Sequence, residues 1–291
     1  MTLLLGIDGG GTGCRAALAT AEGRVLGRGK GGAANIRTDL NGARASIVEA
    51  ARQAFAEAGE DAAQISATPA LLGLAGSNVG TYAEQLEAIL PFRKSVVVSD
   101  ALISLEGAVG TGDGAIAALG TGTVYMVRHG GKARSVGGWG LNVGDQGSGA
   151  RLGRDLLEET LLAHDGLIEA SDLTRALLAV FRNDPADLVE FTTTAKPRDF
   201  GGFAPMVFEY AGKGDPVAER ILARAVHFIT ESLRVMELRP GDPLCLLGGL
   251  AALYEPRLPA HIRALIRPPL QDALGGAVSM AARTFAGAAN G

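Results

Sequence analysis

Cysteine and histidine, the residues that hold most transition metals, are scarce in this sequence. Its 291 residues include two cysteines, Cys14 and Cys245, each within an apolar run that predicts a buried strand. Two thiols are too few for a zinc or iron–sulfur site, and their setting favours free, buried thiols in a reducing compartment over a disulfide. The four histidines show no metal-ligand spacing. We therefore expect neither a zinc nor an iron–sulfur site.

Basic clusters and long apolar runs are also missing. Lys and Arg number 27 against 31 Asp and Glu, for a formal net charge of −4, and the basic residues form no cluster. This charge argues against nucleic acid or an anionic membrane as a partner. The longest later apolar stretch, residues 243–253, contains two glycines and is far too short to cross a bilayer. No basic region precedes the short first apolar run, so we expect no signal peptide and a cytoplasmic protein.

Glycine, in contrast, is abundant, with 42 residues. The mostly apolar residues 3–7 predict a buried strand, which leads into Asp8-Gly9-Gly10-Gly11-Thr12. Glycines have no Cβ and let backbone N–H groups approach an anion, while Thr12 adds a hydroxyl and Asp8 is placed to reach a hydrated Mg²⁺. The motif suggests a site for a polyphosphate and a metal ion. A hairpin turn that is merely rich in glycine is the alternative.

This segment matches neither common nucleotide-binding loop. It lacks the Gly-Lys-Ser/Thr ending of a P-loop. Two predicted strands, residues 14–20 and 24–30, follow it where a dinucleotide-binding fingerprint requires a helix. The hypothesis is therefore narrower than a generic glycine loop: a phosphate-binding β-hairpin.

Strand and helix patterns alternate in the rest of the first hundred residues, with helices expected at 40–58 and 81–90 and buried strands at 70–75 and 95–100. The hairpin theme then returns, because a strand at 114–119 leads through Gly-Thr-Gly-Thr into two further strands. Helix patterns dominate afterwards, at 148–164, 169–181, 203–212, 217–238 and 274–288, with one more buried strand at 244–247. We predict an α/β fold with mixed sheets and two domains, residues 1–108 and 109–291.

Asp100 closes the strand pattern Val-Val-Val-Ser. The carboxyl ends of parallel strands are where open α/β sheets bind ligands. A carboxylate there could accept the proton of an attacking hydroxyl, or it could cap the helix that begins at Ala101. Both interpretations stay open from these residues alone.

The segment 137–149 combines six glycines with Trp139, the only tryptophan, and with Asp145. Such backbone freedom around one large ring suggests a loop that wraps a small polar molecule, with Asp145 binding hydroxyls and Trp139 forming a wall. Alternatively, Trp139 plugs a domain interface and Asp145 caps the next helix. Asn35 is a loop amide that either bonds a sugar or shapes a turn. Gly248-Gly249 either admits part of a nucleotide or forms a tight exit from a strand.

In this order the motifs are similar to those of a known family. The motifs are Gly-Ile-Asp-Gly-Gly-Gly-Thr, Val-Ser-Asp-Ala, Leu-Gly-Thr-Gly-Thr, and Gly-Gly-Trp-Gly followed by Gly-Asp-Gln-Gly-Ser. Together they resemble the N-acetylglucosamine kinase branch of the sugar kinase/Hsp70/actin superfamily, which is grouped with the BadF/BadG-type ATPases. The resemblance covers nearly the whole chain. It implies two ribonuclease-H-like (actin-like ATPase) domains, each a mixed five-stranded sheet flanked by helices, with a cleft between them. The implied reaction transfers the γ-phosphate of ATP to the 6-hydroxyl of an amino sugar.

The resemblance also implies roles for individual residues. Asp100 matches the catalytic base, and Asp8 matches the residue that organises Mg²⁺, through water. The positions that match nucleotide- and phosphate-binding residues are Asp8, Gly10, Gly11, Thr12, Thr121, Gly122, Gly202, Gly248 and Gly249. Those that match sugar-binding residues are Asn35, Ser77, Asp100, Thr123, Gly138, Trp139 and Asp145. ATP and Mg²⁺ are the implied cofactors, and the implied assembly is a homodimer. The last helix of the chain is expected to pack back on the N-terminal domain.

Two departures from the family pattern bear on the substrate. Where a polar residue commonly follows Gly-Thr-Gly-Ser, this chain has Val124 after Thr123, and Gln146 stands where Glu is usual. If residue 124 contacts the N-acetyl group, glucosamine competes with N-acetylglucosamine as the substrate. A hypothesis of a different class is a sugar or nucleotide sensor without catalysis, against which the intact Asp100 and glycine turns argue. Dehydratase-activating ATPases and zinc-containing glucokinases need cysteine ligands that the sequence lacks.

Overall fold

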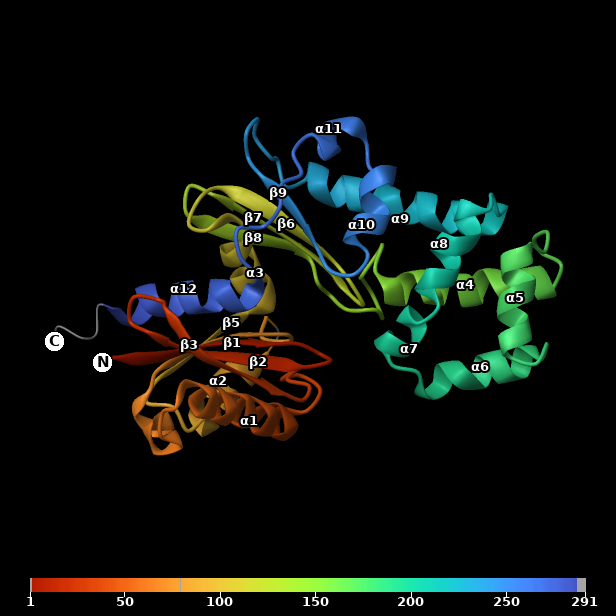
Figure 1. Cartoon of the computed structure of the whole chain (residues 1–291). Coiled ribbons are helices and arrows are strands. Elements are labelled where there is room, and N and C mark those ends of the chain that lie inside the picture. Colours follow the sequence, from red (N-terminus) through yellow and green to blue (C-terminus); the bar gives the residue numbers. More distant parts are fainter. Residues whose placement is uncertain (1, 79, 287–291) are drawn as a thin grey trace. The chain divides into compact units, whose positions relative to one another are not determined.

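The computed structural model of the chain describes residues 2–78 and 80–286. They form two compact units (Figure 1). The first unit contains the residues up to Asp113, Arg128–Ala133 and the residues from Pro268, and the second contains Gly114–Val127 and Arg134–Arg267. The first unit is therefore discontinuous in sequence, since it includes the tip of a hairpin and the last helix.

The first unit is built on a five-stranded sheet of order β3-β2-β1-β4-β5. Its strands are β1 (Leu3–Gly9), β2 (Cys14–Thr20), β3 (Val25–Gly31), β4 (Ala70–Leu74) and β5 (Ser95–Ser99). Strand β1 pairs antiparallel with β2 and parallel with β4. The sheet is mixed because short turns connect β1 to β2 and β2 to β3, which makes these pairs antiparallel. The parallel pairs β1–β4 and β4–β5 need helical crossovers.

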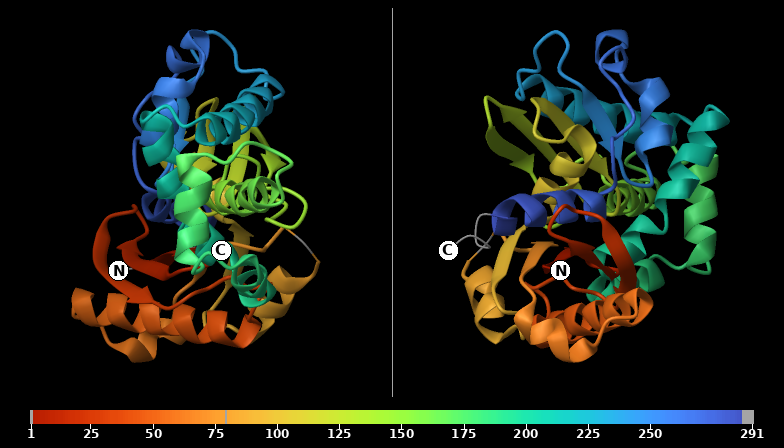
Figure 2. Two further views of the ribbon diagram at one scale, coloured as in Figure 1. Left: turned by 90° about the vertical axis from the view of Figure 1, so that its right-hand side faces the viewer. Right: turned by 60° about the vertical axis from the view of Figure 1, so that its left-hand side comes forward.

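Helices cover both faces of this sheet. They are α1 (Leu40–Ala58), α2 (Tyr82–Ile89), α3 (Asp100–Val109) and α12 (Ala273–Ala286), with the 3-10 helix η1 (Ala62–Ala67). Alternate residues of β1 explain the arrangement, because Leu5 and Ile7 pack in the core with α1 while Leu4 packs with α12. Figure 1 shows α1 and α2 on one face and α3 and α12 on the other, and the right view of Figure 2 shows α12 across β1 and β2.

A stripe of glycines lets α1 lie directly on β3. A Cβ added at Gly27, Gly29 or Gly31 would overlap a backbone carbonyl oxygen of α1. These glycines alternate along β3, so they share one face of the strand, and Arg28 and Lys30 lie on the other. The close packing of α1 thus leaves the charged side chains of β3 on the α12 face of the sheet.

The second unit has a sheet of order β8-β7-β6-β9, with β6 (Gly114–Leu119), β7 (Thr123–His129), β8 (Lys132–Gly137) and β9 (Leu244–Leu247). The order repeats that of β3, β2, β1 and β4, which confirms the predicted repeat. The prediction of five strands in this second sheet is wrong, because the described residues form four. Only one isolated bridge, Leu244 to Ile266, follows on the outer side of β9. Pro268 and Pro269 come directly after Arg267 and cannot donate further ladder hydrogen bonds.

Helices pack on this sheet through a core shared by β6, β7, α4 and α9. The second unit contains α4 (Gly149–His164), α5 (Asp172–Val180), α6 (Pro185–Thr194), α7 (Pro197–Gly201), α8 (Ala204–Gly212), α9 (Pro216–Arg234), α10 (Ala251–Tyr254), η2 (Glu255–Arg257) and α11 (Ala260–Arg263). Helices α6 and α7 were not predicted from the sequence, although Asp184 before Pro185 is a helix-start signal. Positions 287 and 288 of the last predicted helix lie outside the described residues. Among the described residues, no helix combines the length and apolar character that crossing a membrane requires.

Candidate functional site

The first glycine motif forms the turn between β1 and β2, and no helix follows it. The turn is closed by a hydrogen bond from the Gly10 N–H to the Gly13 carbonyl oxygen at 2.9 Å, and the Ala34 N–H donates to the Gly10 carbonyl oxygen. A hollow of about 380 Å³ beside it is lined by Asp8, Gly10, Thr12, Gly13, Cys14, Arg15, Lys30 and Gly31. The hairpin predicted from the sequence is confirmed, and its suggested use, phosphate binding, stays a prediction.

Arg15 is a charged partner of Asp8 that the sequence analysis missed. Its guanidinium donates to Asp8 Oδ2 from Nη2 at 2.6 Å and from Nε at 3.2 Å. The two residues face each other across the antiparallel pair, and Lys30 faces Arg15 on the next strand. Arg15 also donates to Asp272 at 2.8 Å, near the start of α12. Strand register could have revealed this row, because a two-strand hairpin around the glycine turn brings Asp8 and Arg15 opposite each other.

The oxygen ligands in this hollow are of the kind that bind Mg²⁺ in nucleotide-dependent enzymes. Magnesium prefers oxygen ligands, keeps several waters, and is commonly bound by one or two carboxylates together with substrate phosphates. Asp8 supplies such a carboxylate, with Arg15 holding one of its oxygens. Among the described residues, no group of three or more His, Cys, Asp or Glu could hold a metal ion. Cys14 is no ligand candidate, because burial and, to a smaller extent, Asp8 raise the pKa of its thiol to about 12.

Asp100 lies where β5 ends, as the first residue of α3. The interpretation of Asp100 as the helix cap is wrong, because Ser99 is the N-cap and its hydroxyl accepts from the Leu102 N–H at 3.2 Å. Asp100 Oδ1 instead accepts from the Ala101 N–H at 2.9 Å. Desolvation raises the pKa of the Asp100 carboxyl, and the nearby Asp8 carboxylate adds to that rise, while the Ala101 N–H lowers it. A carboxylate with a raised pKa is a stronger proton acceptor.

Asn35 and Ser77 belong to loops of the same unit. Asn35 Oδ1 accepts from the Arg37 N–H at 3.1 Å, which makes the amide part of a turn. Ser77 Oγ donates to the Val98 carbonyl oxygen at 3.2 Å and joins the loop after β4 to strand β5. Their suggested contacts with a sugar stay predictions.

The second glycine turn, between β6 and β7, is tied to the loop that follows β8. The Gly120 N–H donates to the Gly122 carbonyl oxygen at 3.0 Å and closes the turn. Gly149 and Ala150, at the start of α4, donate back to the carbonyl oxygens of Gly120 and Thr121, and Thr123 Oγ1 donates to the Gln146 carbonyl oxygen at 3.2 Å. The turn and the glycine-rich loop therefore form one hydrogen-bonded unit.

The glycine-rich loop presents Asp145 toward this turn. Asp145 has a backbone φ of 59°, which is uncommon for a residue other than glycine, and its side chain is buried. A Cβ added at Gly122 would lie 3.0 Å from Asp145 Oδ2. The alternative that Asp145 caps the next helix is wrong, because Ser148 is the N-cap of α4. Trp139 is 65 % exposed, so the ring is available on the surface of the second unit.

The structure brings three of the predicted nucleotide-binding segments together. A pocket of about 390 Å³ is lined by Gly120, Thr121, Gly149, Arg198, Gly201, Gly202, Ala204, Pro205, Gly249 and Leu250. Ligand pockets typically measure about 300 to 1,000 Å³. Arg198, on α7, was not predicted, and nothing in its local sequence distinguishes it from other exposed arginines.

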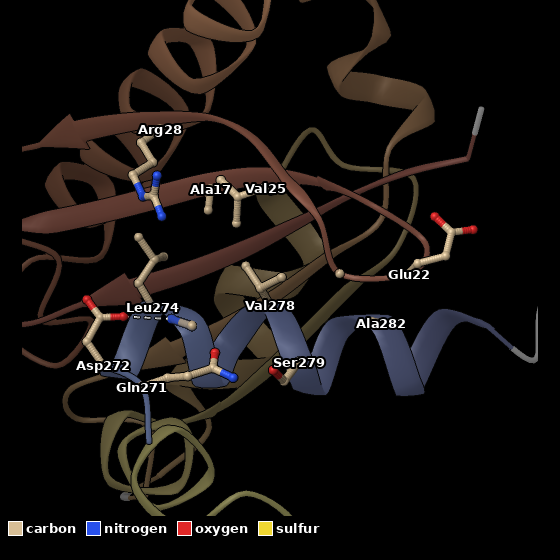
Figure 3. Close-up of a pocket in the computed structure, with 12 residues that line it drawn as sticks. Ala17, Glu22, Val25, Arg28, Gln271, Asp272, Leu274, Val278, Ser279 and Ala282 are labelled. Atoms are coloured by element: carbon tan, nitrogen blue, oxygen red, sulfur yellow. Dashed lines mark hydrogen bonds between the residues drawn. The ribbon is translucent and has the colours of Figure 1, made fainter. Parts of the chain in front are cut away.

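Another pocket lies in the first unit, away from both glycine turns. It measures about 550 Å³ and lies between the β2–β3 hairpin and α12 (Figure 3). Val278 and Leu274 line its apolar part, and Arg28 and Asp272 line its polar part. It contains none of the residues for which the sequence suggested a role.

Comparison with known proteins supports the relationship that the motifs suggested. The chain is 34 % identical to the glucosamine kinase GspK of Vibrio cholerae, over 97 % of both chains. It is 29 % identical to the N-acetyl-D-glucosamine kinase of Dictyostelium discoideum, over 77 % of this chain and 76 % of the other. A Chromobacterium violaceum structure, provisionally described as an N-acetylglucosamine kinase, matches with a TM-score of 0.87 and 33 % identity over 96 % of this chain and 98 % of the other.

More distant structures share the fold alone. A glucokinase of the ROK family from Streptomyces griseus, solved with glucose and AMPPNP, matches with a TM-score of 0.56 at 19 % identity over 96 % of this chain and 98 % of the other. The chain therefore has the mixed α/β fold of sugar kinases and actin-like ATPases. Residues 5–267 match the BadF/BadG/BcrA/BcrD ATPase family, and the chain belongs to that family.

Proposed function

We propose that this protein transfers the γ-phosphate of ATP to the 6-hydroxyl of an amino sugar, with N-acetylglucosamine as the first candidate. An amino-sugar kinase is supported by relatives that match most of this chain. The observation that carries the assignment is Asp100, a desolvated carboxylate with a raised pKa at the carboxyl end of a parallel strand. A sensor without catalysis would have no need of such a base.

In this proposal Asp100 accepts the proton of the 6-hydroxyl as that oxygen attacks the γ-phosphorus. The bond from this phosphorus to the β,γ-bridging oxygen breaks, and ADP leaves. General-base help of this kind contributes about 10²- to 10⁴-fold to a rate. Asp8 would hold Mg²⁺ through water, and the ion would offset the negative charge of the phosphate oxygens. Arg15 fixes the orientation of the Asp8 carboxylate. The backbone N–H groups of the two glycine turns, with Thr12 and Thr121, bind phosphate oxygens, since phosphoryl transfer depends mainly on positioning and electrostatic stabilisation.

The sugar-binding roles in this proposal are those that the family resemblance implies. Asp145 and Asn35 bind sugar hydroxyls, and Trp139 offers an exposed ring as a wall for the sugar. The nucleotide occupies the pocket that Thr121, Gly202 and Gly249 line. A homodimer stays a prediction, and light scattering of the purified protein tests it.

Glucosamine is the second candidate substrate. Val124 stands at a position that is commonly polar in the family, and its Cγ2 lies 3.1 Å from where a Cβ of Gly138 would be. An apolar side chain beside the sugar loop offers no hydrogen bond to an acetamido group. The relative with 34 % identity is named a glucosamine kinase.

The test is coupled ADP release with ATP and Mg²⁺ against N-acetylglucosamine, glucosamine, N-acetylmannosamine and glucose. Preference for one of the first two supports an amino-sugar kinase and chooses between the candidates. The 6-deoxy analogue of the preferred sugar should give no sugar-dependent ADP release, and release equal to that of the parent sugar would exclude the 6-hydroxyl as acceptor. Sugar binding without ADP release would instead support the sensor.

A further inference from the structure

Tyr254 is a buried side chain that joins two parts of the second unit. It is the last residue of α10, its side chain is fully buried, and its hydroxyl donates to the Gly147 carbonyl oxygen at 2.8 Å. The ring packs edge-on against Phe208, with centroids 5.3 Å apart. A buried hydroxyl without a partner is costly, so this hydrogen bond restricts where the ring and Gly147 can lie.

One end of this connection is the predicted nucleotide loop. Helix α10 begins two residues after Gly249, and the Leu250 N–H donates to the Leu119 carbonyl oxygen at 3.0 Å. The Tyr254 N–H in turn donates to the Leu250 carbonyl oxygen. Leu250 also lines the pocket proposed for the nucleotide. A ligand that orders Gly249 and Leu250 therefore orders the helical turn that carries Tyr254.

The other end is the sugar loop. Gly147 has φ 83°, and a Cβ there would lie 2.9 Å from Ile229, so the residue is held in a conformation and a space that suit only glycine. The Ser148 N–H donates to the Asp145 carbonyl oxygen at 2.9 Å and closes a turn around Gly147. Asp145, at the start of that turn, has the positive φ of 59°. The position of the Gly147 carbonyl thus constrains the backbone of Asp145.

We propose that Tyr254 is a positioning residue through which nucleotide binding orders the Asp145 loop for the sugar. The inference rests on the proposed function, which assigns the nucleotide to the Gly249 pocket and the sugar to the Asp145 loop. The six glycines of segment 137–149 leave this loop many conformations, and a fixed hydroxyl at Gly147 removes some of them. Burial raises the pKa of Tyr254, which keeps its hydroxyl a neutral donor.

Trp139 makes the proposal measurable, because it is the only tryptophan and lies within the same loop. The experiment measures the Kd of the preferred amino sugar from Trp139 emission, with and without a saturating non-hydrolysable ATP analogue and Mg²⁺. In the wild type the analogue should tighten sugar binding. In Tyr254→Phe the ratio of the two Kd values should fall by about fivefold, the contribution of one neutral hydrogen bond.

Tyr210→Phe is the matched control, since Tyr210 lies on α8 of the same unit and its hydroxyl has no part in the connection. It should keep the wild-type ratio. An unchanged ratio in folded Tyr254→Phe overturns the inference and leaves the kinase assignment intact. A wild type whose emission responds to neither sugar nor analogue overturns both.

A second measurement needs no variant and covers the case in which Tyr254→Phe does not fold. In the wild type, the ATP analogue with Mg²⁺ and no sugar should slow amide hydrogen exchange in residues 137–149. Slower exchange only around Gly249 and α10, with no change in that loop, would overturn the inference.

Discussion

Replacing Asp100 with asparagine separates the chemical role of this side chain from its effect on stability. Asparagine keeps the carbonyl oxygen that accepts from the Ala101 N–H at 2.9 Å, but it cannot accept the proton of a hydroxyl. Loss of a general base lowers kcat by about 10²- to 10⁴-fold. That decrease corresponds to about 2.7 to 5.4 kcal/mol of lost transition-state stabilisation.

The free energy of unfolding should change in the opposite direction. Desolvation, with a smaller contribution from Asp8, raises the pKa of Asp100 in the folded chain. The wild type therefore has its full stability below the unfolded-state pKa of this group and loses part of it as the pH rises through the folded-state pKa. Asparagine does not ionise. Asp100→Asn should match the wild type at acid pH and exceed it at neutral pH.

Coupled ADP release gives kcat, and urea unfolding from acid to neutral pH gives stability. Ser99→Ala is the control, because Ser99 caps the same helix by accepting from the Leu102 N–H at 3.2 Å. It should cost about 1 kcal/mol of stability and leave kcat near that of the wild type. Wild-type kcat in Asp100→Asn would refute the base, and a variant less stable than the wild type at neutral pH would refute the reasoning from desolvation.

Three further predictions concern other parts of the chain. Glu106 is buried and pairs with two arginines, one of them the buried Arg128. Glu106→Ala should therefore lower the free energy of unfolding, measured in urea, by about 3 to 5 kcal/mol. A decrease below about 1 kcal/mol would contradict a coupled buried pair. Gly29→Ala should cost about 1 to 3 kcal/mol, because its Cβ would overlap α1, whereas Gly212→Ala, with open space around it, should not destabilise. Val124→Ser should raise kcat/KM for N-acetylglucosamine relative to glucosamine, and an unchanged ratio would remove residue 124 from acetyl recognition.

The succession of strands and helices along the chain could be predicted from the sequence because local patterns determine it. Turn residues after short apolar runs predict hairpins, and helix patterns between buried strands predict parallel crossovers. The repeat of the hairpin could be predicted in the same way, since residues 114–137 present strand, Gly/Thr turn and strand in the order already seen in residues 3–30. Five strands in the second sheet could not be excluded in this way, because Ile266 forms a single bridge that leaves no pattern in the sequence.

Side-chain partners were harder to predict. They depend on the register of paired strands and on which of two neighbouring residues of similar chemistry makes a given contact. Ser99 and Asp100 are both good helix caps, as are Asp145 and Ser148, and only the backbone path decides which hydroxyl or carboxylate faces the free N–H groups. In both cases the serine caps the helix and leaves the aspartate for another use. The ion pair of Asp8 with Arg15 likewise requires the exact register of β1 and β2.

The two glycine turns of the repeat differ in the side chains that their own strands supply. Asp8 lies one residue before the end of β1 and faces Arg15 across the hairpin, so the first turn is flanked by ionised groups. The second turn follows Leu119, an apolar residue, and contributes the hydroxyls of Thr121 and Thr123. In the proposed function, Asp8 would hold Mg²⁺ through water beside the transferred phosphate, and Thr121 would bind a phosphate oxygen. The two turns therefore share a place in the sheet order and a backbone form that suits an anion, and they differ in their side chains.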